Sequence, residues 1–171
     1  MKIRNNIVFT VLIVLVVATL SCKKKPAPAT PPSPTVLPPS FSFTAFGITT
    51  AGVQYTINNP TGGPFQVTGS NGSNNSNYQT VVITVSNGSE ITTPGTFTLN
   101  TAASNSSDNA VYTSGTFSYN TNASHTGTIT FSKVDMANRV ISASFSFSAI
   151  EYSPSNNNSG TISGSFTNVG F

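Results

Sequence analysis

Few side chains of this sequence could take part in proton transfer or nucleophilic attack. His125 is the single histidine, and it lies in Asn122-Ala-Ser-His-Thr-Gly127, a segment typical of a loop before a strand. A catalytic triad would need this imidazole beside a nucleophilic hydroxyl and an orienting acid such as Asp108 or Asp135. No G-x-S-x-G motif marks such a nucleophile. We therefore interpret His125 as an exposed loop residue.

The carboxylates also have structural interpretations. They are Glu90, Asp108, Asp135 and Glu151. Glycoside hydrolysis needs two acids across a cleft, but Asp135 is expected to cap the turn that ends at Arg139, with that arginine as its exposed partner. Glu90 and Glu151 are interpreted as solubilising residues at strand edges.

Metal binding is not favoured either. Residues 105–109 are rich in oxygen atoms but contain one acid, whereas a calcium site uses several carboxylates at close spacing. We interpret this segment as a loop. The sequence therefore predicts no catalytic residue, no metal ligand set and no cofactor, and we expect that the chain is not an enzyme.

Charge is scarce and unevenly distributed. Charged residues make up 6% of the chain, against about a quarter in an average soluble domain. From Ser40 onward the basic residues are Lys133 and Arg139, and with four acids they give this part a net charge of −2. Nucleic-acid binding needs several basic side chains on one face, so we exclude it.

The single cysteine follows a segment with the properties of a signal peptide. Lys2 and Arg4 precede a nearly unbroken apolar run from Ile7 to Leu20, and Ser21 and Cys22 follow it. A positive start, a short apolar stretch and a small residue at the cleavage point are typical of a secretory leader. The run is shorter than the ~20 residues that span a bilayer. We therefore assign residues 1–21 to a cleaved signal peptide.

The junction Thr19-Leu20-Ser21-Cys22 resembles a lipobox, the recognition sequence of bacterial lipoprotein signal peptidase. Leu20 stands two places before the cysteine rather than three, as in the looser lipoboxes of Bacteroidota. The resemblance implies that Cys22 becomes the acylated (palmitate-type) first residue and membrane anchor. Lys23 next to it is not the aspartate that retains enterobacterial lipoproteins at the inner membrane. The resemblance thus implies the outer membrane, with the periplasmic face favoured over the cell surface.

Residues 22–40 are expected to form the anchor and a stalk. Seven of the eleven prolines lie between Pro26 and Ser40, and each fixes φ and removes a hydrogen-bond donor. A polyproline II segment rises about 3.1 Å per residue, so these residues reach on the order of 45 Å. The stalk would hold the following domain away from the lipid headgroups.

Residues 41–171 carry the pattern of a β domain. Apolar residues alternate with Ser and Thr in several segments, most clearly from Ile141 to Ala149, and residues 78–86 are dense enough for a central strand. Asn87-Gly88 favours a two-residue hairpin. We predict an all-β, antiparallel meander of about eight to ten strands, folded as a sandwich or small barrel.

The last 45 residues or so, from Gly127-Thr-Ile-Thr-Phe to Gly160-Thr-Ile-Ser-Gly-Ser-Phe166, resemble uncharacterised small all-β lipoproteins of Bacteroidota. The resemblance implies an all-β envelope domain and brings no catalytic residues. We expect a non-catalytic binding or structural module, partnered by the membrane through Cys22 and by another envelope protein. Two alternatives remain: a lipocalin-like carrier of an apolar ligand, and a carbohydrate-binding module that uses Tyr78, Tyr112, Tyr119 or Tyr152.

The anchor gives a direct prediction. Cys22→Ala removes the thiol that would be acylated, so the protein should lose its lipid and either become soluble in the periplasm or remain as precursor. Metabolic labelling with a clickable fatty acid and membrane fractionation measure both effects. A processed Cys22→Ala protein that still sediments with membranes would contradict the lipoprotein interpretation.

Overall fold

The computed structural model describes residues 37–72, 77–86, 89–101, 107–153 and 157–171. The predicted signal peptide, Cys22 and nearly all of the stalk lie outside these residues. The described part contains eleven strands: β1 (Ser40–Ala45), β2 (Ile48–Ala51), β3 (Gln54–Asn58), β4 (Phe65–Ser70), β5 (Gln79–Val85), β6 (Gly95–Leu99), β7 (Asn109–Ser114), β8 (Phe117–Asn120), β9 (Gly127–Asp135), β10 (Val140–Glu151) and β11 (Ser159–Gly170).

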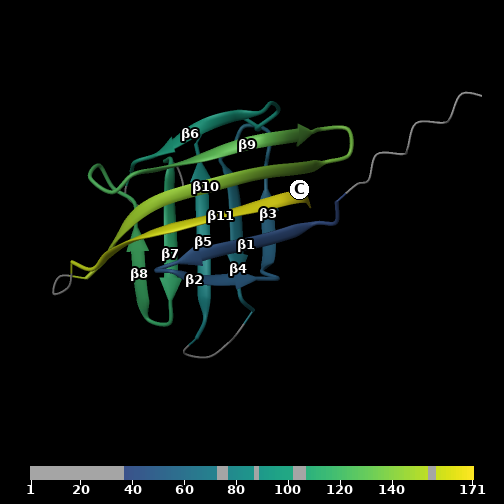
Figure 1. The fold of residues 1–171 in the computed structure, drawn as a ribbon. Coiled ribbons are helices and arrows are strands. Elements are labelled where there is room, and N and C mark those ends of the chain that lie inside the picture. Colours follow the sequence, from purple (N-terminus) through teal and green to yellow (C-terminus); the bar gives the residue numbers. More distant parts are fainter. Residues whose placement is uncertain (1–36, 73–76, 87–88, 102–106, 154–156) are drawn as a thin grey trace, which may run out of the picture. The chain divides into compact units, whose positions relative to one another are not determined.

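The predicted all-β class and antiparallel pairing are confirmed. The strands form one curled sheet, a half-barrel, in the order β2-β1-β11-β10-β8-β7-β5-β4-β3, with β9 beside β10 and β6 beside β9. Figure 1 shows that β6, β9, β10, β11 and β1 run across the strands β3, β4, β5, β7 and β8. The sheet therefore folds over on itself in two layers whose strands cross, as in orthogonal β packing. In the described part of the chain, no helix has the length and hydropathy that a membrane span requires.

Aromatic side chains fill the space between the two layers. The ring centroids of Phe65 (β4) and Phe131 (β9) lie 5.0 Å apart in a T-shaped contact, and Phe43 (β1) meets Tyr112 (β7) at 6.1 Å. Such pairs contribute about 0.5–1.5 kcal/mol beyond the burial of their area. Because each pair joins one layer to the other, these contacts fix how the two halves of the sheet pack.

Strand β10 shows the predicted alternation along most of its length. Ile141, Ala143, Phe145, Phe147 and Ala149 are buried, and Ser144 and Ser146 are exposed. Ser142 is the exception, since it is buried where the registers to both neighbouring strands shift. Its Oγ accepts from Asn168 N at 2.8 Å, and its carbonyl accepts from Ser132 Oγ at 3.3 Å. Such bulges bend a strand and increase its twist.

Two local predictions are corrected. The alternation of Phe117 and Tyr119 with Thr116, Ser118 and Asn120 predicts a buried face for both aromatic side chains. Phe117 is instead 51% exposed, because β8 begins with it directly after the tight turn at Gly115. The hairpin expected at Asn87-Gly88 does not join neighbouring strands, although the two turn residues lie outside the described ones. Strand β5 pairs with β4 and β7, whereas β6 pairs with β9.

The chain instead passes from one layer to the other between β5 and β6, and a buried amide holds this crossing. Asn59 Oδ1 accepts from Ile91 N at 2.8 Å, and Asn59 Nδ2 donates to Ile91 O at 2.9 Å. Both residues are buried. The side chain thus replaces the strand partner that the backbone of Ile91 would otherwise lack.

A close approach at Gly127 marks the place where β10 changes partner. Residues Val140–Phe147 of β10 pair with β9, ending at Phe147 opposite Gly127, and Ile150 and Glu151 pair with β8. A Cβ at position 127 would lie 2.2 Å from Phe147 Cβ and 2.4 Å from its Cα. Only glycine lets the two backbones come this close.

This contact predicts that Gly127→Ala destabilises the domain by about 1–3 kcal/mol, the usual cost of overpacking. Gly95→Ala, also on the β6–β9 pair, is the matched control, because a Cβ there would meet Phe97 Cε2 at an ordinary 3.7 Å. Its effect should stay within about 0.5 kcal/mol. Urea unfolding of both variants measures the difference, and equal midpoints would contradict the close approach.

Candidate functional site

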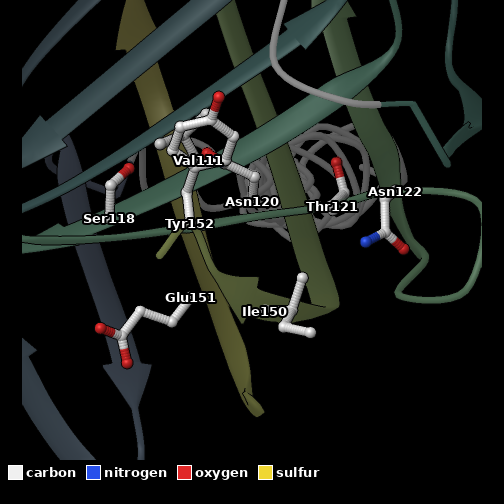
Figure 2. Close-up of a pocket in the computed structure, with 8 residues that line it drawn as sticks. All are labelled: Val111, Ser118, Asn120, Thr121, Asn122, Ile150, Glu151 and Tyr152. Carbon is white, nitrogen blue, oxygen red and sulfur yellow. The ribbon is translucent and has the colours of Figure 1, made fainter. Parts of the chain in front are cut away.

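An open groove lies where β10 leaves β9 and joins β8. It encloses about 620 Å³ and is lined by Val111, Ser118, Asn120, Thr121, Asn122, Ile150, Glu151 and Tyr152. Figure 2 shows these side chains around the end of β10 and the segment that follows β8. The volume lies within the range of roughly 300–1,000 Å³ that is usual for small-ligand sites.

The pairing of β8 with β10 determines which groove residues point to the outer face of the sheet and which point to the inner face. Ile150 pairs with Asn120 and Glu151 pairs with Tyr119, and the backbone N–H of Tyr152 donates to Ser118 O at 2.7 Å. Because successive side chains of a strand point to opposite faces, Ser118, Asn120, Ile150 and Tyr152 share the outer face. Glu151 and Tyr119 share the inner one.

The loop after β8 is fixed by hydrogen bonds. Thr121 is fully buried, and its Oγ1 accepts from Ala110 N at 3.0 Å and donates to Thr101 O at 2.9 Å. Asn122 Oδ1 accepts from the backbone N–H groups of Ser124 and His125, each at 2.8 Å. Ser148 N of β10 donates to Thr126 O at 3.0 Å. The groove wall is therefore held from both ends of its loop.

His125 lies in the predicted loop, but it is half-buried rather than exposed. Its Nδ1 is 3.3 Å from Asn122 Oδ1. The contact closes the turn that orients Asn122, so the imidazole supports the groove wall and is not among the residues that line the groove.

Glu151 was predicted to be a solubilising edge residue, and this prediction is wrong. Its side chain is 5% exposed. Asn158 Nδ2 donates to Glu151 Oε2 at 2.9 Å, and Glu151 N donates to Asn158 O at 2.8 Å. The position continues the inward set of β10 after Phe147 and Ala149, so the alternation itself places this carboxylate inside, where hydrogen bonding compensates its burial.

Three aromatic rings pack together on this inner side of the groove. Tyr119 lies 4.8 Å from Phe46 and 5.9 Å from Tyr112 between ring centroids, and Phe46 lies 5.9 Å from Tyr112. Tyr112 is 2% exposed. The tyrosines suggested for carbohydrate binding therefore do not form one exposed face, because Tyr112 and Tyr119 belong to this cluster. Of the other two suggested tyrosines, Tyr78 is half-buried, and Tyr152 is 84% exposed and lines the groove.

Burial raises the pKa of the Tyr119 phenol above its usual value, and the negative charge of Glu151 and then Tyr112 raise it further. The folded state therefore favours the neutral phenol. Stability from this source is complete below the pKa of an unfolded tyrosine and is lost as the pH rises through the higher folded value.

The remaining titratable residues lie apart from the groove. Asp135 caps its turn as predicted, accepting from Asn138 N at 3.0 Å and from Asn138 Nδ2 at 2.9 Å. These hydrogen bonds, the side-chain one first, lower the pKa of Asp135. The expected contact between Asp135 and Arg139 is not formed. Arg139 Nε donates to Phe171 O at 2.7 Å instead, and its guanidinium lies 4.8 Å from the Phe171 ring centroid.

The carboxylates of Asp108 and Glu90 each accept a hydrogen bond from another part of the chain. Asp108 Oδ1 accepts from Ser86 N at 2.5 Å, and Glu90 Oε2 accepts from Thr61 Oγ1 at 3.4 Å. Of the segment 105–109, residues 107–109 are described. In the described ranges no group of three His, Cys, Asp or Glu residues could hold a metal ion.

A smaller hollow of about 430 Å³ lies at the other end of β10. Leu37, Pro39, Lys133, Asp135, Asn138, Val140 and Asn168 line it. Asn168 Nδ2 donates to Leu37 O at 2.9 Å, and Lys133 Nζ donates to Asn168 Oδ1 at 3.1 Å. The chain that leads from the predicted stalk thus enters the domain at the β9–β10 turn.

Sequence reasoning missed most of the groove residues, namely Val111, Ser118, Asn120, Thr121, Asn122 and Ile150. The run Asn120-Thr121-Asn122 after a strand was a signal for a polar loop, but nothing in it revealed that the end of β10 lies alongside. No protein-family model, curated protein or solved structure shows a significant match to this chain.

The position of Glu151 predicts that Glu151→Gln lowers the pKa of Tyr119 towards its ordinary value. The shift should be partial, because desolvation by burial is the largest cause and remains. Glutamine keeps an oxygen that can accept from Asn158, so the fold should be retained. The Tyr119 ring resonances of ¹³C-tyrosine-labelled protein, followed by NMR from neutral to alkaline pH, give the measurement.

Glu90→Gln is the control for this experiment, because Glu90 is not among the groups that shift Tyr119. An unchanged Tyr119 titration in Glu151→Gln, or an equal change in Glu90→Gln, would contradict the proximity of the two side chains.

Proposed function

We propose that this chain is a lipid-anchored protein of the cell envelope whose β domain is a non-catalytic binding module, with the groove at the end of β10 as its binding surface. The observation that carries the proposal is that Leu37, where the described part of the chain begins, and the groove lie at opposite ends of strand β10.

Strand β10 begins at Val140, which lines the hollow beside Leu37, and ends at Glu151, which lines the groove. At about 3.3 Å per residue, its twelve residues span up to roughly 35 Å. A chain tethered through Cys22 and the proline-rich stalk would therefore hold the groove on the side away from its point of attachment. A binding surface in this place is accessible to partners in the envelope.

The packed interior favours this role over that of a lipocalin-like carrier. The largest fully buried side chains include Phe43, Phe65, Phe131, Phe147 and Phe166. Their rings occupy the space between the two layers, which in a carrier would hold the apolar ligand. The groove, in contrast, is open to solvent and combines apolar and neutral polar side chains.

The chemistry of the groove is suited to binding rather than to catalysis. Glu151, its one carboxylate, is buried and accepts a hydrogen bond from Asn158. The lining residues that the structure describes provide no second carboxylate and no imidazole, whereas general acid–base catalysis usually relies on such a positioned pair. We further propose that the protein is located at the outer membrane, with the periplasmic face favoured over the cell surface. Its partner would be another component of the envelope.

Site-specific photocrosslinking in intact cells tests this proposal. A photoreactive benzoylphenylalanine at position 152 replaces an exposed aromatic residue at the groove. Benzoylphenylalanine in place of Met136, whose side chain is 36% exposed, probes the turn between β9 and β10 at the other end of strand β10. We expect adducts with envelope components from position 152 and few or none from position 136. Equal adducts from the two positions, or none from position 152, would overturn the groove as the binding surface.

A further inference from the structure

Most of the groups that line the groove are neutral and lie next to an exposed aromatic ring, while the carboxylate of Glu151 is buried and hydrogen-bonded to Asn158. Ser118 supplies a hydroxyl, Asn120 and Asn122 supply amides, and Val111, Ile150 and Tyr152 supply apolar surface, whereas the hydroxyl of Thr121 is buried and already hydrogen-bonded. None of its described lining residues is a lysine or an arginine. Anionic ligands are usually bound by such cations or by helix N-termini, so the lining favours an uncharged ligand with both hydroxyl groups and apolar faces.

The amide of Asn122 is already oriented. Its Oδ1 accepts from Ser124 N and His125 N, which leaves the two N–H groups of Nδ2 as donors. Figure 2 shows the nitrogen of this amide on the side of Thr121 and Ile150, with the oxygen turned away. A donor fixed by the fold before a ligand arrives lowers the entropic cost of binding.

Asn120 and Ser118 extend the row of polar groups along β8. They are half-buried, two residues apart on one face, and so about 7 Å apart. Among the described residues, the structure shows no hydrogen-bond partner for either side chain. A half-buried amide without a protein partner gains more from a ligand hydroxyl than a fully hydrated one.

Tyr152 supplies the apolar platform. Its side chain is 84% exposed, yet its backbone is fixed by the 2.7 Å hydrogen bond to Ser118 O. The β8–β10 register places the ring on the same face as Ser118, Asn120 and Ile150. A rigid aromatic side chain with few rotatable bonds gives a large contact area at low entropic cost.

We propose that the groove binds a neutral oligosaccharide, an inference that rests on the proposed function of the groove. A pyranose ring presents C–H bonds on its faces and hydroxyls around its edge. One face packs on Tyr152 and Ile150, while the edge hydroxyls accept from Asn122 Nδ2 and exchange hydrogen bonds with Asn120 and Ser118. The site thus recognises a sugar by one aromatic ring rather than by a cluster of tyrosines.

The test uses the purified, acylated chain in a detergent without a sugar headgroup. Maltohexaose, cellohexaose and chitohexaose are the neutral probes, and a hexamer of galacturonate is the anionic one. Calorimetric titration gives affinities, and ¹⁵N NMR locates the perturbed amides. We expect at least one neutral hexamer to bind and to shift the signals of residues 118–122 and 150–152, with no binding of the uronate.

Matched variants separate recognition from folding. Tyr152→Ala should weaken binding about tenfold or more, as expected for a central aromatic contact, without changing the urea midpoint, because the ring is exposed. Asn120→Ala should weaken binding about fivefold, the loss of one hydrogen bond. Phe117→Ala removes an aromatic side chain of β8 that is 51% exposed and does not line the groove, so its affinity should stay within about twofold.

Three outcomes would overturn the saccharide: no binding of any neutral hexamer, binding that perturbs amides away from the groove, or equal affinities for Tyr152→Ala and Phe117→Ala. If these occur while position 152 still crosslinks to an envelope protein, the binding surface stands and its ligand is a protein. If crosslinking fails as well, both proposals fall.

Discussion

The structure depends on one strand that serves both layers. Strand β10 pairs with β11 along one side, and on the other side with β9 first and with β8 last. The change of partner needs the close backbone approach at Gly127, and the bulges opposite Ser142 bend the strand on its way there. Where three strands meet in this way, the backbone cannot continue as a regular ladder. The space left at the junction is the groove, and the loop from Thr121 to Thr126 forms its wall.

The same strand explains why the groove contains a buried acid. The residues of its predicted inward set are apolar until Glu151, and that position comes after the last β9 partner. Replacing the carboxylate with an apolar residue would leave Asn158 Nδ2 without the acceptor it has at 2.9 Å. Glu151 therefore links the end of β10 to the residue before β11, and its charge adds to desolvation by burial in raising the pKa of the neighbouring Tyr119.

Local patterns in the sequence were sufficient for the strands but not for their partners. The alternation of Phe145 and Phe147 with serines is a property of one strand, and the structure confirms it. That β5 is followed by a crossing rather than a hairpin depends on Asn59, thirty-two residues before Ile91, which a local pattern does not include. Glu151 was predicted to be exposed for a related reason. Its charge was given more weight than its place in the inward-facing alternation of β10. The groove could not be predicted at all, because it is made by the pairing of β8 with β10.

The scarcity of charged residues affects both how the domain contacts water and how its groove would select a ligand. With 6% charged residues, the chain relies on serine, threonine and asparagine for contact with water. These groups form directional hydrogen bonds and exert no long-range attraction, so a partner is selected by the placement of its donors and acceptors and not by electrostatic steering. Because screening by salt acts on charges, binding through Ser118, Asn120 and Asn122 would change little with ionic strength. A largely neutral groove at the end of β10 would in this way recognise its ligand independently of the local salt concentration.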